Sequence, residues 1–275
     1  MNPARVDLHL HSTASDGALA PQAVLDLASE RGVELLALTD HDTLAGYTGM
    51  ASTPPGLRLV TGVEFSTSWR RIGIHVVGLG VGCHAAAMRT ACAHQAAARD
   101  RRAHAIADYL RRRGVPDAYA GAARLAAGAG IGRPHFAALL VERGVVSEPE
   151  QAYKRYLKRA REAHAVDFWA GLGEIVGWIR DAGGSAVLAH PGHYRLTHMR
   201  LDELVGEFAA LGGTALELVS GRQHPTLTPT LATLARRHGL AVSFGSDFHR
   251  VGPGMAGPGI DVELPRGLRA VWEDW

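Results

Sequence analysis

Histidine and acidic residues recur in five short segments that lie far apart in this chain of 275 residues. In the first segment, His9 and His11 are two residues apart, so both side chains would share one face of a β-strand. One such pair is weak evidence, because most histidines are only hydrogen-bonded, but the repetition favours a metal centre. Together with His75, the segments supply six histidines and three carboxylates: His9, His11, Asp16, His41, Glu64, His75, His190, Asp247 and His249.

The types of donor indicate which metals would bind. Imidazole and carboxylate without thiolate suit zinc, manganese or iron, and the set is large enough for more than one divalent cation. The chain has two cysteines, Cys83 and Cys92, and their separation matches no common zinc-binding spacing. They cannot form a disulfide framework either, so we expect reduced thiols in a cytoplasmic protein.

Seven short apolar runs are predicted to be strands, and most are rich in valine and leucine, as in a parallel sheet covered on both faces. They are residues 6–10, 35–39, 57–61, 74–78, 186–189, 215–219 and 241–244. Helical patterns occupy residues 23–31, 174–181, 201–211 and 231–238. This alternation predicts an α/β barrel or a doubly wound sheet.

The positions of the candidate ligands help to choose between these two folds. Most of them fall at or just beyond the C-terminal ends of the predicted strands. A barrel enzyme collects catalytic groups there from many strands, whereas an open sheet concentrates its site in one crevice. We therefore predict an α/β barrel.

The alternation stops between residues 84 and 165, where alanine and arginine are frequent and no strand is predicted. Helices are expected at 84–113, 134–143 and 148–162, with a flexible stretch near 127–130. We predict a discontinuous barrel, 1–83 and 166–275, interrupted by an all-helical insertion, 84–165. The insertion carries 15 lysines and arginines against 7 acidic residues, while the whole chain has a net charge of only +2. A basic segment on an acidic body favours a polyanionic substrate, although a solvated helical surface explains the charge equally well.

The ordered motifs Asp-Leu-His-Leu-His-Ser, Thr-Asp-His-Asp, Gly-Val-Glu-Phe-Ser, Ala-His-Pro-Gly and Gly-Ser-Asp-Phe-His run from residue 7 to residue 249. This set resembles the PHP (polymerase and histidinol phosphatase) family, and the resemblance extends to the segment 267–272. It implies a distorted seven-stranded β/α barrel that hydrolyses phosphoesters with two or three divalent metal ions, of which manganese is the metal that we expect.

The resemblance also implies a role for each candidate ligand. His9, His11, Glu64 and Asp247 would hold the first metal; Glu64, His75 and His190 the second; and Asp16, His41 and His249 the third. Some family members have histidine at the position of Asp16, which leaves the affinity of the third site open. Asp40 and Asp42 would orient His41 and its loop, and a direct proton-transfer role for Asp40 is the alternative.

Such a site needs no protein nucleophile. Two cations roughly 3.5–4 Å apart can hold a bridging hydroxide that attacks phosphorus. The sequence contains no Gly-x-Ser-x-Gly elbow and no Walker-type loop, so serine hydrolysis and nucleoside-triphosphate hydrolysis lack support.

Arginines of the predicted insertion could recognise phosphate. Arg99 and Arg102 share one face of the first helix, and Arg133 and His135 stand where the next helix begins. These segments resemble the branch of the family that removes the 3′-phosphate from nucleoside 3′,5′-bisphosphates and trims short 5′-phosphorylated RNA from its 5′ end. The resemblance implies that the four residues grip the second phosphate, and the alternative is that the arginines only solubilise an alanine-rich helix.

The predicted partner is therefore a nucleoside bisphosphate or a short RNA, and not a DNA duplex or a membrane. No apolar run approaches the ~20 residues that span a bilayer, and no signal peptide precedes the first strand. Trp169 is predicted to be a packing residue. The competing hypotheses are a histidinol-phosphate-type phosphomonoesterase and a PHP module without catalytic activity. The oligomeric state stays open.

Overall fold

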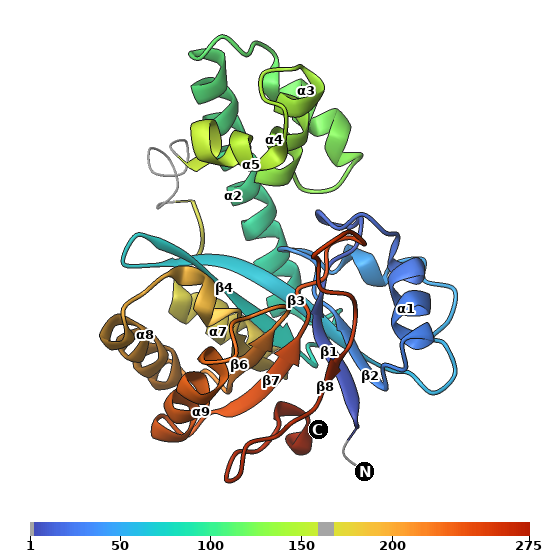
Figure 1. Ribbon diagram of the computed structural model, residues 1–275, viewed down its shortest axis with the longest axis vertical. Coiled ribbons are helices and arrows are strands. Elements are labelled where there is room, and N and C mark those ends of the chain that lie inside the picture. Colours follow the sequence, from blue (N-terminus) through green and yellow to red (C-terminus); the bar gives the residue numbers. More distant parts are fainter. Residues whose placement is uncertain (1–2, 159–167) are drawn as a thin grey trace.

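A computed structural model describes residues 3–158 and 168–275 of the chain. It consists of a twisted sheet that curls into a barrel, with a group of helices standing above it (Figure 1). The predicted end of the insertion at residue 165, and the end of the helix predicted at 148–162, lie outside the described residues.

The barrel is built from one mixed sheet in the order β7-β6-β5-β4-β3-β2-β1-β8. Its strands are β1 (Arg5–Leu10), β2 (Leu35–Leu38), β3 (Arg58–Trp69), β4 (Ile72–Leu79), β5 (Ser185–Leu188), β6 (Ala215–Ser220), β7 (Ala241–Gly245) and β8 (Ile260–Asp261). The seven predicted strands correspond to β1–β7, and the short β8 pairs with the start of β1. At the other end of β1, the backbone N–H of His11 donates to the carbonyl of Phe248 just after β7 (2.9 Å), which nearly closes the ring. The predicted α/β barrel is confirmed.

The expectation of a parallel sheet is wrong for one of the seven predicted strands, and the additional short strand β8 also runs antiparallel, to β1. β4 runs antiparallel to both of its neighbours, β3 and β5, because Arg70 and Arg71 form a tight hairpin turn with positive φ. β3 also continues to Trp69 instead of ending at residue 61, so Glu64 lies within the strand. The reversal matters because His75 lies in the first half of β4, and only an antiparallel β4 pairs it with Ser66, beyond Glu64 on β3.

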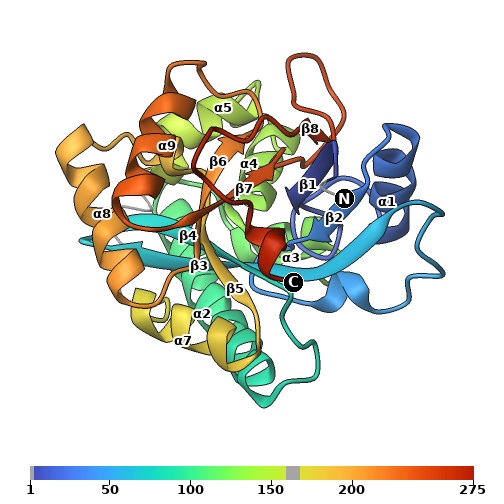
Figure 2. The same ribbon diagram turned by 90° about the horizontal axis from the view of Figure 1, so that it is seen from below.

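Four helices cover the outside of the barrel, as predicted, although each begins earlier than its sequence pattern. They are α1 (Pro21–Glu30), α7 (Leu172–Asp181), α8 (His198–Ala210) and α9 (Leu227–Arg237). Seen from below, α7, α8 and α9 lie outside β5–β7, and α1 lies beside β1 and β2 (Figure 2). Their apolar faces bury residues such as Val176, Ile179 and Phe208 in the main hydrophobic core. Short helical turns are η1 (Ala45–Tyr47), η3 (Pro191–Tyr194) and η4 (Val271–Asp274).

The helices above the barrel come from one stretch of sequence. They are α2 (Ala86–Arg111), α3 (Ala118–Ala126), α4 (Arg133–Glu142), α5 (Pro149–Ala152) and the π-helical turn η2 (Tyr153–Leu157); we call this group the helical segment. Sequence analysis missed α3, whose preceding residue, Asp117, adopts a left-handed conformation without capping the helix through its side chain. The segment has its own cluster of buried side chains, including Leu110, Phe136, Leu140 and Leu157.

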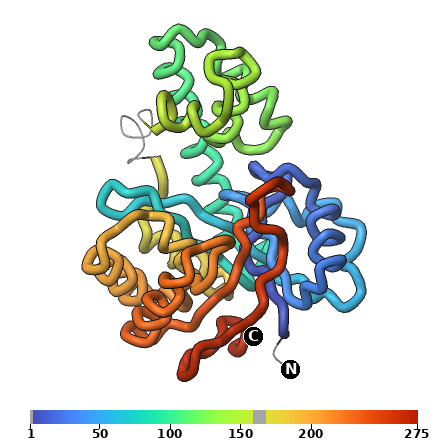
Figure 3. The backbone as a smooth tube through the Cα atoms, viewed as in Figure 1, coloured from blue at the N-terminus to red at the C-terminus, as the bar shows by residue number. Residues whose placement is uncertain are grey.

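The helix α2 joins this cluster to the barrel (Figure 3). At its start, Met88 and Ala91 are buried in the main core of the barrel. Toward its end, Ile106 and Leu110 belong to the core of the helical segment. No helix of the described residues is long and apolar enough to cross a membrane.

Candidate metal centre

Glu64 stands at the centre of the candidate ligands. The carboxylate is fully buried, and one of its oxygens, Oε1, lies 2.8 Å from His75 Nδ1, 2.9 Å from His190 Nε2 and 3.3 Å from His9 Nε2. The other oxygen, Oε2, lies 2.9 Å from His41 Nδ1 and 3.3 Å from His11 Nε2. One carboxylate therefore contacts five histidines from four different parts of the barrel.

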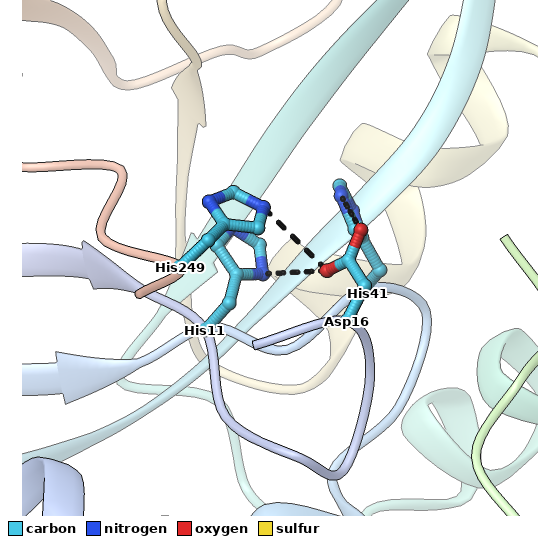
Figure 4. Close-up of side chains that lie close together, drawn as sticks. All are labelled: His11, Asp16, His41 and His249. Atoms are coloured by element: carbon cyan, nitrogen blue, oxygen red, sulfur yellow. Dashed lines mark ion pairs between the residues drawn. The ribbon is translucent and has the colours of Figure 1, made fainter. Parts of the chain in front are cut away.

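Asp16 and Asp247 complete the set on one side of Glu64. The carboxylate of Asp16 is 3.5 Å from His249 and 3.9 Å from both His11 and His41 (Figure 4). Asp247 Oδ1 is 3.4 Å from His11 and 3.6 Å from His249. The structure thus brings all nine candidate ligands together at one end of the barrel.

These ligands form three overlapping groups whose donor atoms lie within 4.8 Å of one another. The groups are His11, Asp16, His41 and His249; His9, His11 and Glu64; and His41, Glu64 and His75. Their overlap at Glu64 and the histidines is the geometry expected of neighbouring cation sites that share ligands.

The hydrogen bonding of the cluster fits divalent cations. Several fully buried atoms have no hydrogen-bond partner among the described residues: His9 Nε2, His11 Nδ1 and Nε2, His41 Nδ1, Glu64 Oε2 and His190 Nδ1. Each such atom costs about 1–3 kcal/mol if it stays unsatisfied. Imidazole nitrogens and carboxylate oxygens that converge in this way have the chemistry of ligands for zinc, manganese or iron.

The histidines also favour the ionised form of the carboxylates among them. Burial alone would raise the pKa of Glu64, but the neighbouring His41, His75 and His9 hold that pKa well below its usual value. Burial likewise opposes ionisation of Asp247, and contact with His11 outweighs it and lowers the pKa. Both carboxylates are therefore ionised at neutral pH and can face cations.

One residue that supports the cluster was missed by sequence analysis. Glu217 is a buried carboxylate on β6, and its Oε1 lies 3.0 Å from Nδ1 of His9. Its Oε2 accepts a hydrogen bond from the backbone N–H of His190. Glu217 thus turns His9 so that Nε2 faces Glu64, and it holds the strained backbone of His190, whose φ is +27°. The only feature of the sequence that could have indicated this role is the presence of an acidic residue inside an apolar run.

The carboxylate of Asp40 accepts hydrogen bonds from a neighbouring loop. It accepts hydrogen bonds from the backbone N–H of Ser12 (2.8 Å), the hydroxyl of Ser12 (2.7 Å) and the hydroxyl of Ser15 (2.7 Å). These contacts fix the loop that carries Asp16. The geometry therefore favours a positioning role for Asp40 over proton transfer.

Asp42 holds a second network, which reaches the helical segment. It accepts hydrogen bonds from the backbone N–H of Ser66 (2.8 Å), from Gln95 (2.9 Å) and from Nε of Arg99 (3.1 Å). Burial opposes ionisation of Asp42, and the charge of Arg99 outweighs it and lowers the pKa. Arg99 is only 7% exposed, and its guanidinium also donates to the hydroxyl of Ser66 (3.3 Å), so this side chain is part of the network.

His135 lies at the start of α4, where its Nδ1 accepts a hydrogen bond from the backbone N–H of Gly132 (2.9 Å). Burial lowers the pKa of His135, which suits a neutral imidazole in this capping role. The side chain of Arg133 lies near Tyr153 instead: its guanidinium carbon is 6.0 Å from the centre of the tyrosine ring.

A cavity of about 650 Å³ lies between the cluster and the helical segment. Its floor includes Asp16, His41, Glu64, His75, His190, Asp247 and His249, and its walls carry Arg71, Arg99, Arg102, Arg133 and Lys158. Three of the four predicted phosphate-binding residues therefore reach the cavity, and among its described lining residues His135 is absent. Trp169, predicted to be a core or packing residue, is partly buried and lines the cavity as well.

A family model described as "PHP domain" matches residues 7–172, more than half of the chain. The chain belongs to the PHP domain family. The matched range contains most of β1, all of β2–β4 and the helical segment, whereas His190, Asp247 and His249 follow it.

Relatives within the PHP domain family cover nearly the whole chain. A 5′-3′ exoribonuclease from Salmonella typhimurium is 40% identical over 98% of this chain and 93% of its own length. A 3′,5′-nucleoside bisphosphate phosphatase from Chromobacterium violaceum is 38% identical over 98% of this chain and 96% of its own. A structure described as an amidohydrolase from Chromobacterium violaceum, with bound sulfate and no metal, superimposes with a TM-score of 0.87 at 37% identity. It covers 98% of this chain and 95% of that chain.

Proposed function

We propose that this protein is a metal-dependent phosphoesterase that hydrolyses the 3′-phosphate of nucleoside 3′,5′-bisphosphates, removes nucleotides in the 5′→3′ direction from short 5′-phosphorylated RNA, or does both. One observation carries the proposal. A cluster of buried, converging and unpartnered ligand atoms opens into a cavity whose other walls carry five cationic side chains. The exoribonuclease and bisphosphate phosphatase activities for which the relatives at 40% and 38% identity are named support the same choice of substrate.

The proposed assignment of residues to metal ions follows the family resemblance and overlaps only in part with the three groups of donors. His9, His11, Glu64 and Asp247 would hold one ion, Glu64, His75 and His190 a second, and Asp16, His41 and His249 a third. Manganese is the proposed metal, with zinc and iron as alternatives. When bound, such ions supply Lewis-acid chemistry and activate water.

The protein's own side chains would then position the substrate. Arg102 and Arg133 lie on the wall formed by the helical segment, where a guanidinium can bind a phosphate through two parallel hydrogen bonds. We assign them to the second phosphate of the substrate. Arg99 contributes positive charge to the same wall, but Asp42 already accepts its Nε–H. His135 would act indirectly, by fixing the start of the helix that presents Arg133.

We retain the proposed division into a barrel, 1–83 and 166–275, and a helical clamp, 84–165. The separate hydrophobic cluster of the helical segment supports it. We also retain the proposal of a cytoplasmic location, which the two free cysteines fit.

The decisive experiment measures phosphate release by the manganese-loaded protein from adenosine 3′,5′-bisphosphate, adenosine 5′-monophosphate and histidinol phosphate, side by side. We expect a strong preference for the bisphosphate, followed by activity on a short 5′-phosphorylated RNA. Equal or faster release from a monophosphate would favour the histidinol-phosphate-type enzyme. Full metal content without release from any of these compounds would favour a non-catalytic module.

A further inference from the structure

The indole ring of Trp169 lies on the cavity wall at the junction of the barrel and the helical segment. The side chain is only partly buried, and it lines the same cavity as the metal-centre residues. The guanidinium carbons of Arg99 and Arg102 lie 5.5 Å and 5.4 Å from the centre of the ring. A flat aromatic surface therefore stands next to two positive charges, within reach of a ligand in the cavity.

The backbone around Trp169 is fixed from several directions. Next to it, the N–H of Ala170 donates to the side-chain oxygen of Gln95 (3.2 Å), and the carbonyl of Ala170 accepts from the hydroxyl of Thr67 (2.7 Å). On the other side, Arg101 donates to the carbonyl of Phe168 (3.3 Å). These bonds tie the position of the ring to β3 and to α2.

We propose that Trp169 is the surface on which the nucleobase of the substrate stacks. This inference rests on the proposed function. Stacking of a base on an aromatic side chain is worth about 1–3 kcal/mol, and guanidinium groups beside the ring suit a phosphate of the same nucleotide. An aliphatic phosphate would use the cations and make no stacking contact with the ring, so the pairing of ring and arginines fits a nucleotide.

The remaining wall points to recognition through the face of the base. Among the described residues that line the cavity, none is asparagine or glutamine, the carboxamides that read base edges. The hydroxyl of Thr67 already donates to Ala170, and that of Ser66 donates to Asp42 (3.0 Å). Purines should therefore bind more tightly than pyrimidines, because their stacking area is larger.

The test compares adenosine 3′,5′-bisphosphate with its abasic tetrahydrofuran analogue, which keeps both phosphates and lacks the base. The variants are Trp169→Leu, Trp169→Phe and the matched control Trp275→Leu, which removes a tryptophan that is 36% exposed outside the cavity. We expect Trp169→Leu to raise KM for the adenosine compound roughly tenfold to hundredfold and to leave KM for the abasic compound unchanged. Trp169→Phe should retain most of the affinity, and the control should behave like the wild type.

Equilibrium dialysis of both compounds against the metal-free protein gives a readout that does not depend on turnover. A wild type that binds both compounds equally would overturn the role of Trp169, even if hydrolysis proceeds. Equal weakening of both compounds by Trp169→Leu would also overturn it, since the ring would then only orient the arginines. If neither compound is hydrolysed although the adenosine compound binds more tightly through Trp169, the proposed function fails and the base-binding surface stands. Thermal unfolding of each variant separates these outcomes from loss of the fold.

Discussion

The two sides of the cavity are built in opposite ways. On the barrel side, His11 and Glu64 are fully buried, and strands or residues joined to them by backbone hydrogen bonds set their positions. On the helical side, Arg102 and Arg133 are partly exposed and Lys158 is exposed, on helices that pack around a separate core. The comparison teaches that the groups for chemistry and the groups for choosing a substrate rest on different scaffolds. The two scaffolds meet at the buried Asp42–Arg99 pair and at the base of α2.

The largest effect is expected from a substitution among the candidate metal ligands on the barrel side of the cavity. Asp247→Asn keeps the shape of the side chain but removes the charge that faces His11 and His9. We expect turnover to fall on the order of 10³-fold, because metal ions contribute several kcal/mol to such reactions. Metal analysis of the purified protein should show fewer bound ions than in Arg102→Ala, the matched control on the helical side. Unchanged metal content in Asp247→Asn would contradict its place in the centre.

Arg99 sits where the two sides meet, so its removal should affect both. Arg99→Ala leaves the buried Asp42 without its charged partner, which typically costs about 3–5 kcal/mol of stability. Thermal or urea unfolding measures that loss. The double variant Arg99→Leu with Asp42→Asn should recover part of it, and no recovery would place the role of Arg99 elsewhere.

A smaller effect on the barrel side is expected at Glu217. Glu217→Gln keeps the volume but weakens the hold on His9 Nδ1 and on the backbone of His190. We expect metal affinity to fall about 10- to 100-fold, as measured by competition with a chelator of known affinity. Substitution of Glu203 by glutamine on the outside of α8 is the matched control. If both variants bind metal like the wild type, Glu217 does not position the ligands.

The smallest effect should come from the helical side alone. Arg102→Ala removes one cation from the cavity wall and leaves the buried clusters intact. We expect KM for adenosine 3′,5′-bisphosphate to rise roughly tenfold, the order of a charged hydrogen bond, with metal content and melting temperature unchanged. A fall in kcat with an unchanged KM would place Arg102 with the reacting phosphate instead of the second one.

The gathering of most candidate ligands follows from local sequence, but the place of His75 depends on the antiparallel β4. His9, His41, His190 and Asp247 each stand at the end of a short apolar run, and parallel strands bring such ends to one edge. The role of these residues as metal ligands stays a prediction. Two features were beyond sequence analysis. The Arg70-Arg71 turn has none of the glycine or asparagine that usually marks a hairpin. Glu217 gains its partners only when the barrel brings β6 within reach of His9 on β1 and of His190 just after β5.

The partial exposure of Trp169 could not be predicted from the sequence either, for a related reason. A tryptophan beside Ala170 in an apolar stretch has the sequence pattern of a core residue, since Ala170 and Leu172 are indeed buried. Only the cavity between the barrel and the helical segment leaves the ring accessible. Surfaces formed by two separately packed units cannot be inferred from the periodicity of either one.

Because α2 is long, a small tilt at its base produces a large displacement at its far end. Its 26 residues extend about 39 Å at the usual rise of 1.5 Å per residue, with the base set into the barrel at Met88 and Ala91. A tilt of only about 3° at that base would displace the far end by roughly 2 Å, and Arg99 and Arg102 near the middle by roughly 1 Å. A misplacement of about 1 Å is enough to change a rate by on the order of 10²-fold. The packing of Met88 and Ala91 in the barrel core therefore helps to set where the arginines stand relative to the metal centre, although these two side chains are buried away from the substrate.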